Sequence, residues 1–248
     1  MAINLSPSES TYQPVTDSEA SVSIMLTTID RLGDTAEGID RLESETGDGE
    51  LTQRVFIKRF DLKETEKLAA CQELLVNIKK TAEKRIQNAF RTLEEIPEAH
   101  PLLISDRPVP NPDLILRSIR TLLKYKIRTE ANKALEKGFD FFQKWRSLFS
   151  DAELHDPTFG YRVGGGYPEH YYTALGQYLK ITSGMDGQTV PPNLHQMSAD
   201  YFEHRLNSPG YPKNTNDLRS LAQILERSGV LSFEGDESIF DRLTSDPS

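Results

Sequence analysis

The chain is poor in the residues that build disulfides, membrane spans and secretion signals. Its one cysteine, Cys71, excludes an intramolecular disulfide framework and indicates a reducing compartment. No apolar run approaches the roughly 20 residues that span a bilayer. The first residues also lack the basic and apolar parts of a secretory signal. We therefore expect a cytoplasmic protein without a membrane partner.

Motifs for a cofactor, a metal or a catalytic group are missing as well. The glycines Gly164–Gly166 are followed by Tyr167 and Pro168, whereas a phosphate-binding loop requires lysine and then serine or threonine. No pair of residues has the HExxH or CxxC spacing of a zinc site. We therefore expect no cofactor and no metal. The sequence leaves open whether the glycine loop and the nearby tyrosines and histidines form a ligand site or a packing surface.

Tyrosine and histidine residues are scarce in the first 150 positions and frequent after them. Residues 155–211 hold seven of the nine tyrosines and four of the five histidines. Just before them, the densest aromatic cluster lies between Phe139 and Phe149, with Trp145 at its centre, and such clusters at helical spacing are typical of a core. These patterns predict a helical frame that presents an aromatic, loop-rich region.

Regular apolar spacing predicts a mainly α fold. Steps of three and four residues between apolar positions recur in three stretches, residues 22–39, 68–96 and 116–145. The second stretch predicts a helix over 61–96, about 54 Å long. The third predicts a helix that has Pro112 in its first turn and Phe142 and Trp145 near its end, in which Gly138 is a candidate bend. A proline-rich connector over 97–112 joins the two helices, so they should form a long antiparallel hairpin.

Three domains follow from this reading. They are an acidic N-terminal arm with a short heptad helix (1–50), the helical hairpin (51–150), and a smaller α-helical, loop-rich region that is rich in aromatic and histidine residues and ends in an acidic tail (151–248). The tail contains Phe240-Asp241-Arg242-Leu243, a variant of a tetrapeptide that occurs at Ile29–Leu32 and Ile39–Leu42. Ile239, Phe240 and Leu243 form an apolar motif suited to docking.

Opposite charges are separated along the chain. Residues 1–50 contain eleven acidic residues and two arginines, whereas residues 107–146 contain ten basic and four acidic residues. Such segments can pair within one chain or between two copies, or lie on separate solvated helix faces.

Two sets of residues are predicted to bind a partner. One is an apolar seam at heptad spacing, made of Val22, Met25, Ile29, Leu32 and Ile39. The other is a basic stripe on one helix face, made of Arg117, Arg120, Lys124 and Arg128. The seam either packs on the chain itself or docks on a partner or a second copy. The stripe suits an acidic protein segment better than nucleic acid, because the net charge is −9 and no aromatic residues alternate with it.

The leading hypothesis is a non-enzymatic structural or adaptor protein that acts through protein–protein contacts in a homo-oligomer or a larger assembly. The first alternative is a nucleic-acid-associated protein that uses the basic stripe. The second is an enzyme with its site in the 155–205 region, which requires a concave pocket that gathers at least three side chains of Tyr161, Arg162, His170, His195 and His204. Asp200 and His204 share a helix face, which favours a local contact over a metal site.

Overall fold

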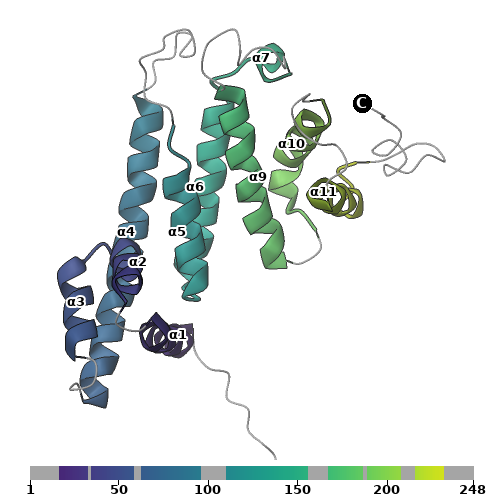
Figure 1. Cartoon of the computed structure of the whole chain (residues 1–248). Helices are drawn as coiled ribbons and strands as arrows, with labels where there is room; N and C mark the ends of the chain where they lie inside the picture. Colours follow the sequence, from purple (N-terminus) through teal and green to yellow (C-terminus); the bar gives the residue numbers. More distant parts are fainter. Residues whose placement is uncertain are drawn as a thin grey trace, which may run out of the picture. The chain divides into compact units, whose positions relative to one another are not determined.

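The computed structural model describes residues 17–32, 35–58, 63–95, 110–155, 167–186, 189–207 and 216–231. Its elements (Figure 1) are α1 (Asp17–Leu32), α2 (Ala36–Thr46), α3 (Gly49–Lys58), α4 (Glu64–Glu94), α5 (Asp113–Lys124), α6 (Arg128–Arg146), α7 (Asp151–His155), α9 (Tyr167–Asp186), the short 3-10 helix η2 (Pro192–Leu194), α10 (His195–Asn207) and α11 (Asn216–Arg227). No strand occurs among these described residues, so the predicted mainly α fold is confirmed.

The chain divides into two compact units. The first comprises residues 1–80 and 122–128, and the second comprises residues 81–121 and 129–248. Because α4 and α5 each contribute to both units, this division follows packing rather than composition. The boundaries at residues 50 and 150, which composition predicts, stay a prediction.

The first unit is built from α1, α2, α3, the N-terminal part of α4 and the turn after α5. Each of the four helices contributes buried apolar side chains, among them Met25, Leu42, Val55 and Leu74. The sharp connection between α2 and α3 depends on Gly47, whose φ of 69° lies in the left-handed region that glycine adopts without strain. Asp48 then accepts a hydrogen bond from the Leu51 N–H (2.9 Å), which satisfies a backbone donor in the first turn of α3.

The single helix predicted from Pro112 to beyond Trp145 is two helices, because the chain leaves α5 at Lys126 with a φ of 52°. The N–H groups of Lys126 and Ile127 donate to the carbonyls of Leu123 and Leu122 (3.0 and 2.9 Å), which is the bond pair of a Schellman motif. A lysine in this conformation costs on the order of 1 kcal/mol. Burial of Tyr125 and Ile127 offsets that cost. The long antiparallel hairpin over 51–150 is therefore not confirmed.

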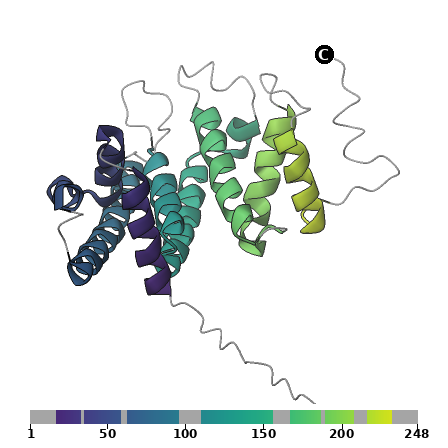
Figure 2. The same cartoon turned by 60° about the horizontal axis from the view of Figure 1, so that its bottom comes forward.

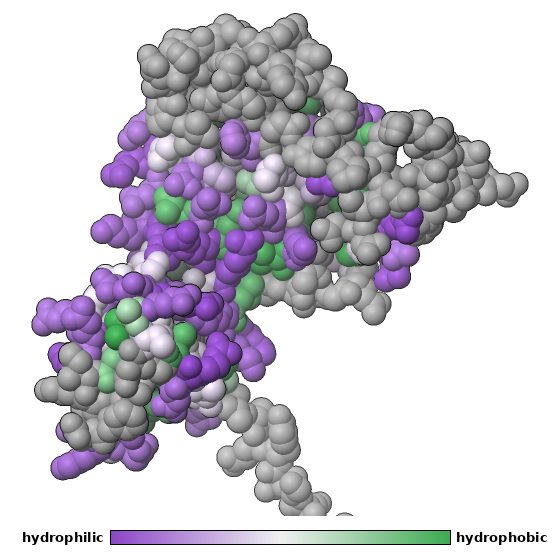
Figure 3. Space-filling view, in the orientation of Figure 1, coloured by the Kyte–Doolittle hydropathy of each residue, from purple (hydrophilic) through white to green (hydrophobic). Residues whose placement is uncertain are grey.

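Most of the apolar face predicted along α4 is buried, including Cys71, Leu75, Ile78, Ala82, Ala89 and Leu93. Leu68 departs from the prediction with 44% exposure, because the first two turns of α4 lie outside the core. Val76 is 46% exposed on the same helix, and among the described residues no other large hydrophobic side chain is as open. On the face seen in Figure 3, hydrophilic residues accordingly cover most of the described surface.

The second unit contains the C-terminal part of α4, most of α5, and helices α6, α7, α9, α10 and α11 (Figures 1 and 2). Side-chain contacts give the helix directions. Phe90 meets Phe141 and Glu94 meets Lys144, so α4 and α6 run parallel. Ring contacts from Tyr171 and Tyr178 reach α6 in the reverse order, so α9 runs antiparallel to α6. Helix α10 in turn runs antiparallel to α9.

The predicted aromatic cluster is the core of this second unit. Phe141, Phe142, Trp145, Tyr171 and Tyr178 are almost completely buried, and their rings meet at centroid distances of 5.1 to 6.2 Å. Gly138, a candidate bend in the sequence, lies instead within the uninterrupted helix α6. Its missing side chain makes room for the ring of Tyr178, since a Cβ there would lie 2.6 Å from Tyr178 Cε2.

Candidate functional site

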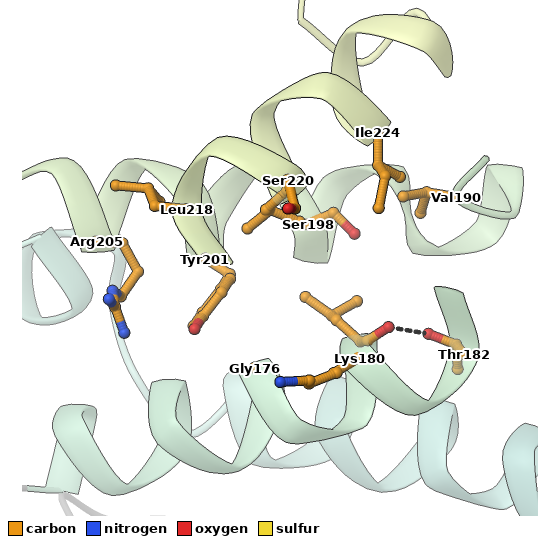
Figure 4. Close-up of a pocket in the computed structure, with 12 residues that line it drawn as sticks. Gly176, Lys180, Thr182, Val190, Ser198, Tyr201, Arg205, Leu218, Ser220 and Ile224 are labelled. Carbon is orange, nitrogen blue, oxygen red and sulfur yellow. Dashed lines mark hydrogen bonds between the residues drawn. The ribbon is translucent and has the colours of Figure 1, made fainter. Parts of the chain in front are cut away.

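A pocket of about 330 Å³ lies in the second unit between α9, α10 and α11 (Figure 4). Its apolar lining comes from all three helices and from the segment before η2, and includes Leu179, Val190, Leu218, Leu221 and Ile224. Spacings of three and four residues place the lining residues of each helix on one face. The pocket is therefore the space that remains where three apolar helix faces meet without closing completely.

Gly176 and Tyr201 define how closely α9 and α10 approach at this pocket. A Cβ on Gly176 would lie 2.5 Å from the hydroxyl oxygen of Tyr201, so only a glycine leaves space for this ring across α9. Figure 4 shows Tyr201 extending from α10 toward α9 beside the side chain of Arg205.

The polar groups of the pocket are cationic or hydroxylic. Lys180 from α9 and Arg205 from α10 line it, and the lining contains no acidic residue. The pocket thus combines an apolar interior with positive charge, a combination that attracts an apolar segment carrying carboxylates.

Ser198 of α10 contributes a hydroxyl to the same lining. Its side chain is fully buried, and within the described structure its Oγ has no hydrogen-bond partner. A serine inside a helix ordinarily bonds to the carbonyl four residues earlier, and an unpaired buried hydroxyl costs about 1–3 kcal/mol. Thr182, by contrast, bonds to the carbonyls of its own helix at Tyr178 and Leu179. The hydroxyl of Ser198 is therefore available to a bound group.

A partly buried ion pair between α6 and α10 holds α10 in place behind the pocket. Arg146 Nε donates to Asp200 Oδ2 at 2.9 Å, and Gln196 Nε2 donates to Asp200 Oδ1 at 2.8 Å. Arg146 also donates to Asp151 at 3.0 Å, which links α6 and α7 to the same carboxylate cluster. Asp200 is buried and accepts two hydrogen bonds, so it is held firmly. Ser198 and Tyr201 lie on the same helix and are positioned with it.

Three of the five residues of the enzyme hypothesis, all histidines, lie in the described part of the chain, and they occupy separate surroundings. His170 is exposed, and His195 Nε2 bonds to the carbonyl of Val190 at 3.1 Å. His204 is buried and stacks on Tyr172 at a ring-centroid distance of 3.7 Å. None of these three histidines lines the pocket, and Tyr161 and Arg162 lie outside the described residues, as does the Gly164–Gly166 loop. Asp200, which the sequence pairs with His204, accepts hydrogen bonds from Arg146 and Gln196.

Tyr171 and Tyr172 of α9 pack among other aromatic rings. Their hydroxyl oxygens are buried and have no hydrogen-bond partner in the described part of the chain. Burial raises the pKa of both phenols, and the negative charge of Asp200 adds to the effect. Both rings therefore act as neutral packing groups. In the residues that the structure describes, no cluster of three or more histidine, cysteine, aspartate or glutamate side chains suits a metal ion.

The apolar seam of the N-terminal arm lies mostly inside the first unit. Val22, Met25 and Ile29 are buried there, while Leu32 and Ile39 are partly exposed. The buried members pack on their own chain, which was one of the two expectations for this seam. They present no free surface to a partner in this arrangement.

The basic stripe is divided between two helices and is partly neutralised. Lys124 donates to both carboxylate oxygens of Glu45 (2.7 and 2.8 Å), so the acidic N-terminal segment of the same chain pairs with the stripe. Arg120 donates to Gln177 at 3.0 Å. Arg117 is exposed on α5, whereas Arg128 opens α6 beyond the turn. Three of the four cations thus lie on α5 and the fourth on α6.

Sequence reasoning missed the pocket, although one signal for it was present. Lys180 and Arg205 are the only lysine or arginine residues between positions 163 and 212, and both line the pocket. A second signal is the pair of small residues Gly176 and Ser198, which each face the same space.

None of the helices described has the length and apolar content that a membrane crossing needs. No protein-family model, curated protein or solved structure matches the chain.

Proposed function

We propose that the protein is a non-enzymatic adaptor that binds an acidic, amphipathic segment of a partner protein in the pocket between α9, α10 and α11. The observation that carries this proposal is the composition of the pocket. Five large aliphatic side chains form its interior, Lys180 and Arg205 supply positive charge, and the lining contains no acidic residue. Binding in this way serves the assembly of a larger complex.

The occupant is a short helix rather than an extended strand. No sheet edge exists among the described residues to pair with a strand, whereas faces of three helices form the pocket walls. An amphipathic helix places apolar residues three and four positions apart into such a groove and leaves its acidic residues at the rim. Carboxylates there meet Lys180 and Arg205, and a polar group of the helix reaches the hydroxyl of Ser198.

Nucleic acid is a weaker candidate for the partner. Phosphate binding needs several cations along one track, but Lys124 is held by Glu45 and Arg128 lies on a different helix from Arg117 and Arg120. With a net charge of −9, the chain as a whole also repels polyanions. The pocket offers only two cations around an apolar interior, which suits an acidic peptide better than a phosphate backbone.

Fluorescence anisotropy tests the proposal with a labelled synthetic peptide of about 15 residues, which is long enough for four helical turns. The probe carries leucines at helical spacing and glutamates elsewhere, and a second probe has lysines in place of the glutamates. We expect the acidic probe to bind and the basic probe not to bind. Because surface charges are screened by salt, affinity should fall as sodium chloride is added.

Charge-reversed variants locate the binding. Lys180→Glu with Arg205→Glu should weaken binding of the acidic probe by about tenfold or more. Arg117→Glu with Lys133→Glu is the matched control, because it changes the net charge equally at two exposed positions outside the pocket. Equal weakening in both variants, or binding of a simple fatty-acid anion without binding of the peptide, would overturn the proposal.

A further inference from the structure

We propose that the same pocket also binds the chain's own C-terminal segment, residues 232–248, which thereby competes with the partner segment. This inference rests on the proposed function of the pocket, since it assigns a second ligand to that site. The segment itself lies outside the described residues, so the evidence comes from its sequence, from the pocket and from the point at which the described chain ends.

The segment has the composition that the pocket selects. Residues 232–248 contain five acidic residues and one arginine, so they carry a net negative charge opposite to that of Lys180 and Arg205. Ile239, Phe240 and Leu243 supply apolar groups at spacings of three and four residues, which share one face of a helix. Ser238 precedes Asp241 by three residues, the spacing of a capping box that begins a helix.

Two related tetrapeptides in the same chain show how this motif packs. Ile29–Leu32 and Ile39–Leu42 both lie in helices, where Ile29 and Leu42 are buried and the central Asp-Arg pair of each is exposed. In both copies, an apolar residue of the motif is therefore buried in a helix interface, and the charged pair faces solvent. Phe240–Leu243 repeats this pattern with a larger apolar residue at its first position.

The described chain ends close to the pocket. The N–H of Leu231 donates to the carbonyl of Leu225 at 3.4 Å, next to Ile224 of the pocket lining. Val190, also in the lining, donates to Ser228 Oγ at 2.8 Å, so the exit from α11 lies beside the pocket. Eight residues lie between Leu231 and Phe240, and the nine steps from one to the other span at most about 30 Å, whereas the pocket extends along only about 9 Å of α11. The motif can therefore reach the pocket of its own chain.

Paramagnetic relaxation in the full-length protein tests this contact. A nitroxide is attached through Ser248→Cys, and Cys71 does not interfere because it is buried. We expect the label to broaden the backbone amide signals of pocket residues such as Lys180, Ser198 and Ile224. The broadening should disappear in the same protein carrying Phe240→Asp with Leu243→Asp. It should persist with Thr244→Asp and Ser245→Asp, which add the same charge to the tail without touching the apolar motif.

A mixed sample separates contact within one chain from contact between copies. Labelled protein without isotope is mixed with isotope-labelled protein without nitroxide, and we expect no broadening in this sample. Broadening in the mixture, unchanged broadening after Phe240→Asp with Leu243→Asp, or no broadening in any sample would each overturn the inference.

The acidic peptide probe then separates this inference from the proposed function. A tethered segment competes at an effective concentration in the millimolar range, so removing it with Phe240→Asp and Leu243→Asp should tighten binding of the probe by about tenfold. If the probe binds the unmodified protein and the variant equally, the pocket still binds partners but the tail is not its ligand. If the tail contact is present but the probe never binds, the proposed adaptor function fails instead.

Discussion

Replacing Gly138 with alanine tests the packing of α6 against α9, which supports the wall of the pocket. The new Cβ would lie 2.6 Å from Cε2 of Tyr178 and 3.3 Å from its Cδ2. This ring cannot easily retreat. It is 1% exposed, its hydroxyl donates to the carbonyl of Leu135 at 2.6 Å, and Phe142 lies 5.1 Å away on its other side. Therefore either helix α9 shifts away from α6 or the hydrogen bond from Tyr178 to Leu135 breaks.

Two opposing terms set the magnitude for Gly138→Ala. Alanine is favoured over glycine in a helix by about 1 kcal/mol. Overpacking a closed core costs about 1–3 kcal/mol, and losing the bond from Tyr178 to Leu135 would leave buried polar groups unpaired at a cost of about 1–3 kcal/mol. The free energy of unfolding should therefore fall by about 2 kcal/mol. Urea denaturation followed by circular dichroism measures it.

Gly49→Ala is the matched control, since it places the same methyl group in another helix, at the start of α3. There the closest atoms belong to the carboxylate of Glu43, the end of a flexible, partly exposed side chain that can move aside. Stability should stay within about 1 kcal/mol of the unmodified protein, or rise, because helix propensity then dominates. A Gly138→Ala protein that is as stable as the unmodified one would refute the account of this interface.

Three further predictions concern buried titratable or polar groups. Tyr171→Phe removes a buried hydroxyl without a described partner, so urea denaturation should show equal or greater stability; a loss above about 1 kcal/mol would contradict this. Burial raises the pKa of Tyr125, Tyr171, Tyr172 and Tyr178, so these phenols keep protons that the unfolded chain releases. Their stabilisation is complete below pH 10, and the free energy of unfolding should fall above it by about 1.4 kcal/mol per pH unit and tyrosine; constant stability from pH 9 to 11 would contradict this. Burial, with a smaller effect of Asp30, raises the pKa of Cys71 to about 11, so a thiol reagent near pH 8 should react only as the protein unfolds, and immediate reaction would exclude a buried thiol.

Local patterns predicted much of the fold but only fragments of the candidate site. Helical spacing identified the helices, and the aromatic cluster around Trp145 is indeed core. Separated charges suggested pairing, and Lys124 meets Glu45. The pocket could not be predicted in the same way, because its lining joins residues from Gly176 to Ile224 on three helices. The 155–205 stretch, which the sequence singles out for its tyrosines and histidines, overlaps the pocket lining, but the lining contains no histidine.

The amino-acid sequence by itself determined that the chain is helical, since apolar residues three and four positions apart can share a face only in a helix. After α11, Gly229 takes the left-handed conformation (φ 67°), which glycine adopts without strain. Only the tertiary structure decided what covers each apolar face. Periodicity continues across the break at Lys126, where burial of Tyr125 outweighs the strain in a non-glycine residue. Burial of Val22 and Met25, and the incomplete closure of α9, α10 and α11, likewise depend on contacts between segments far apart in the chain.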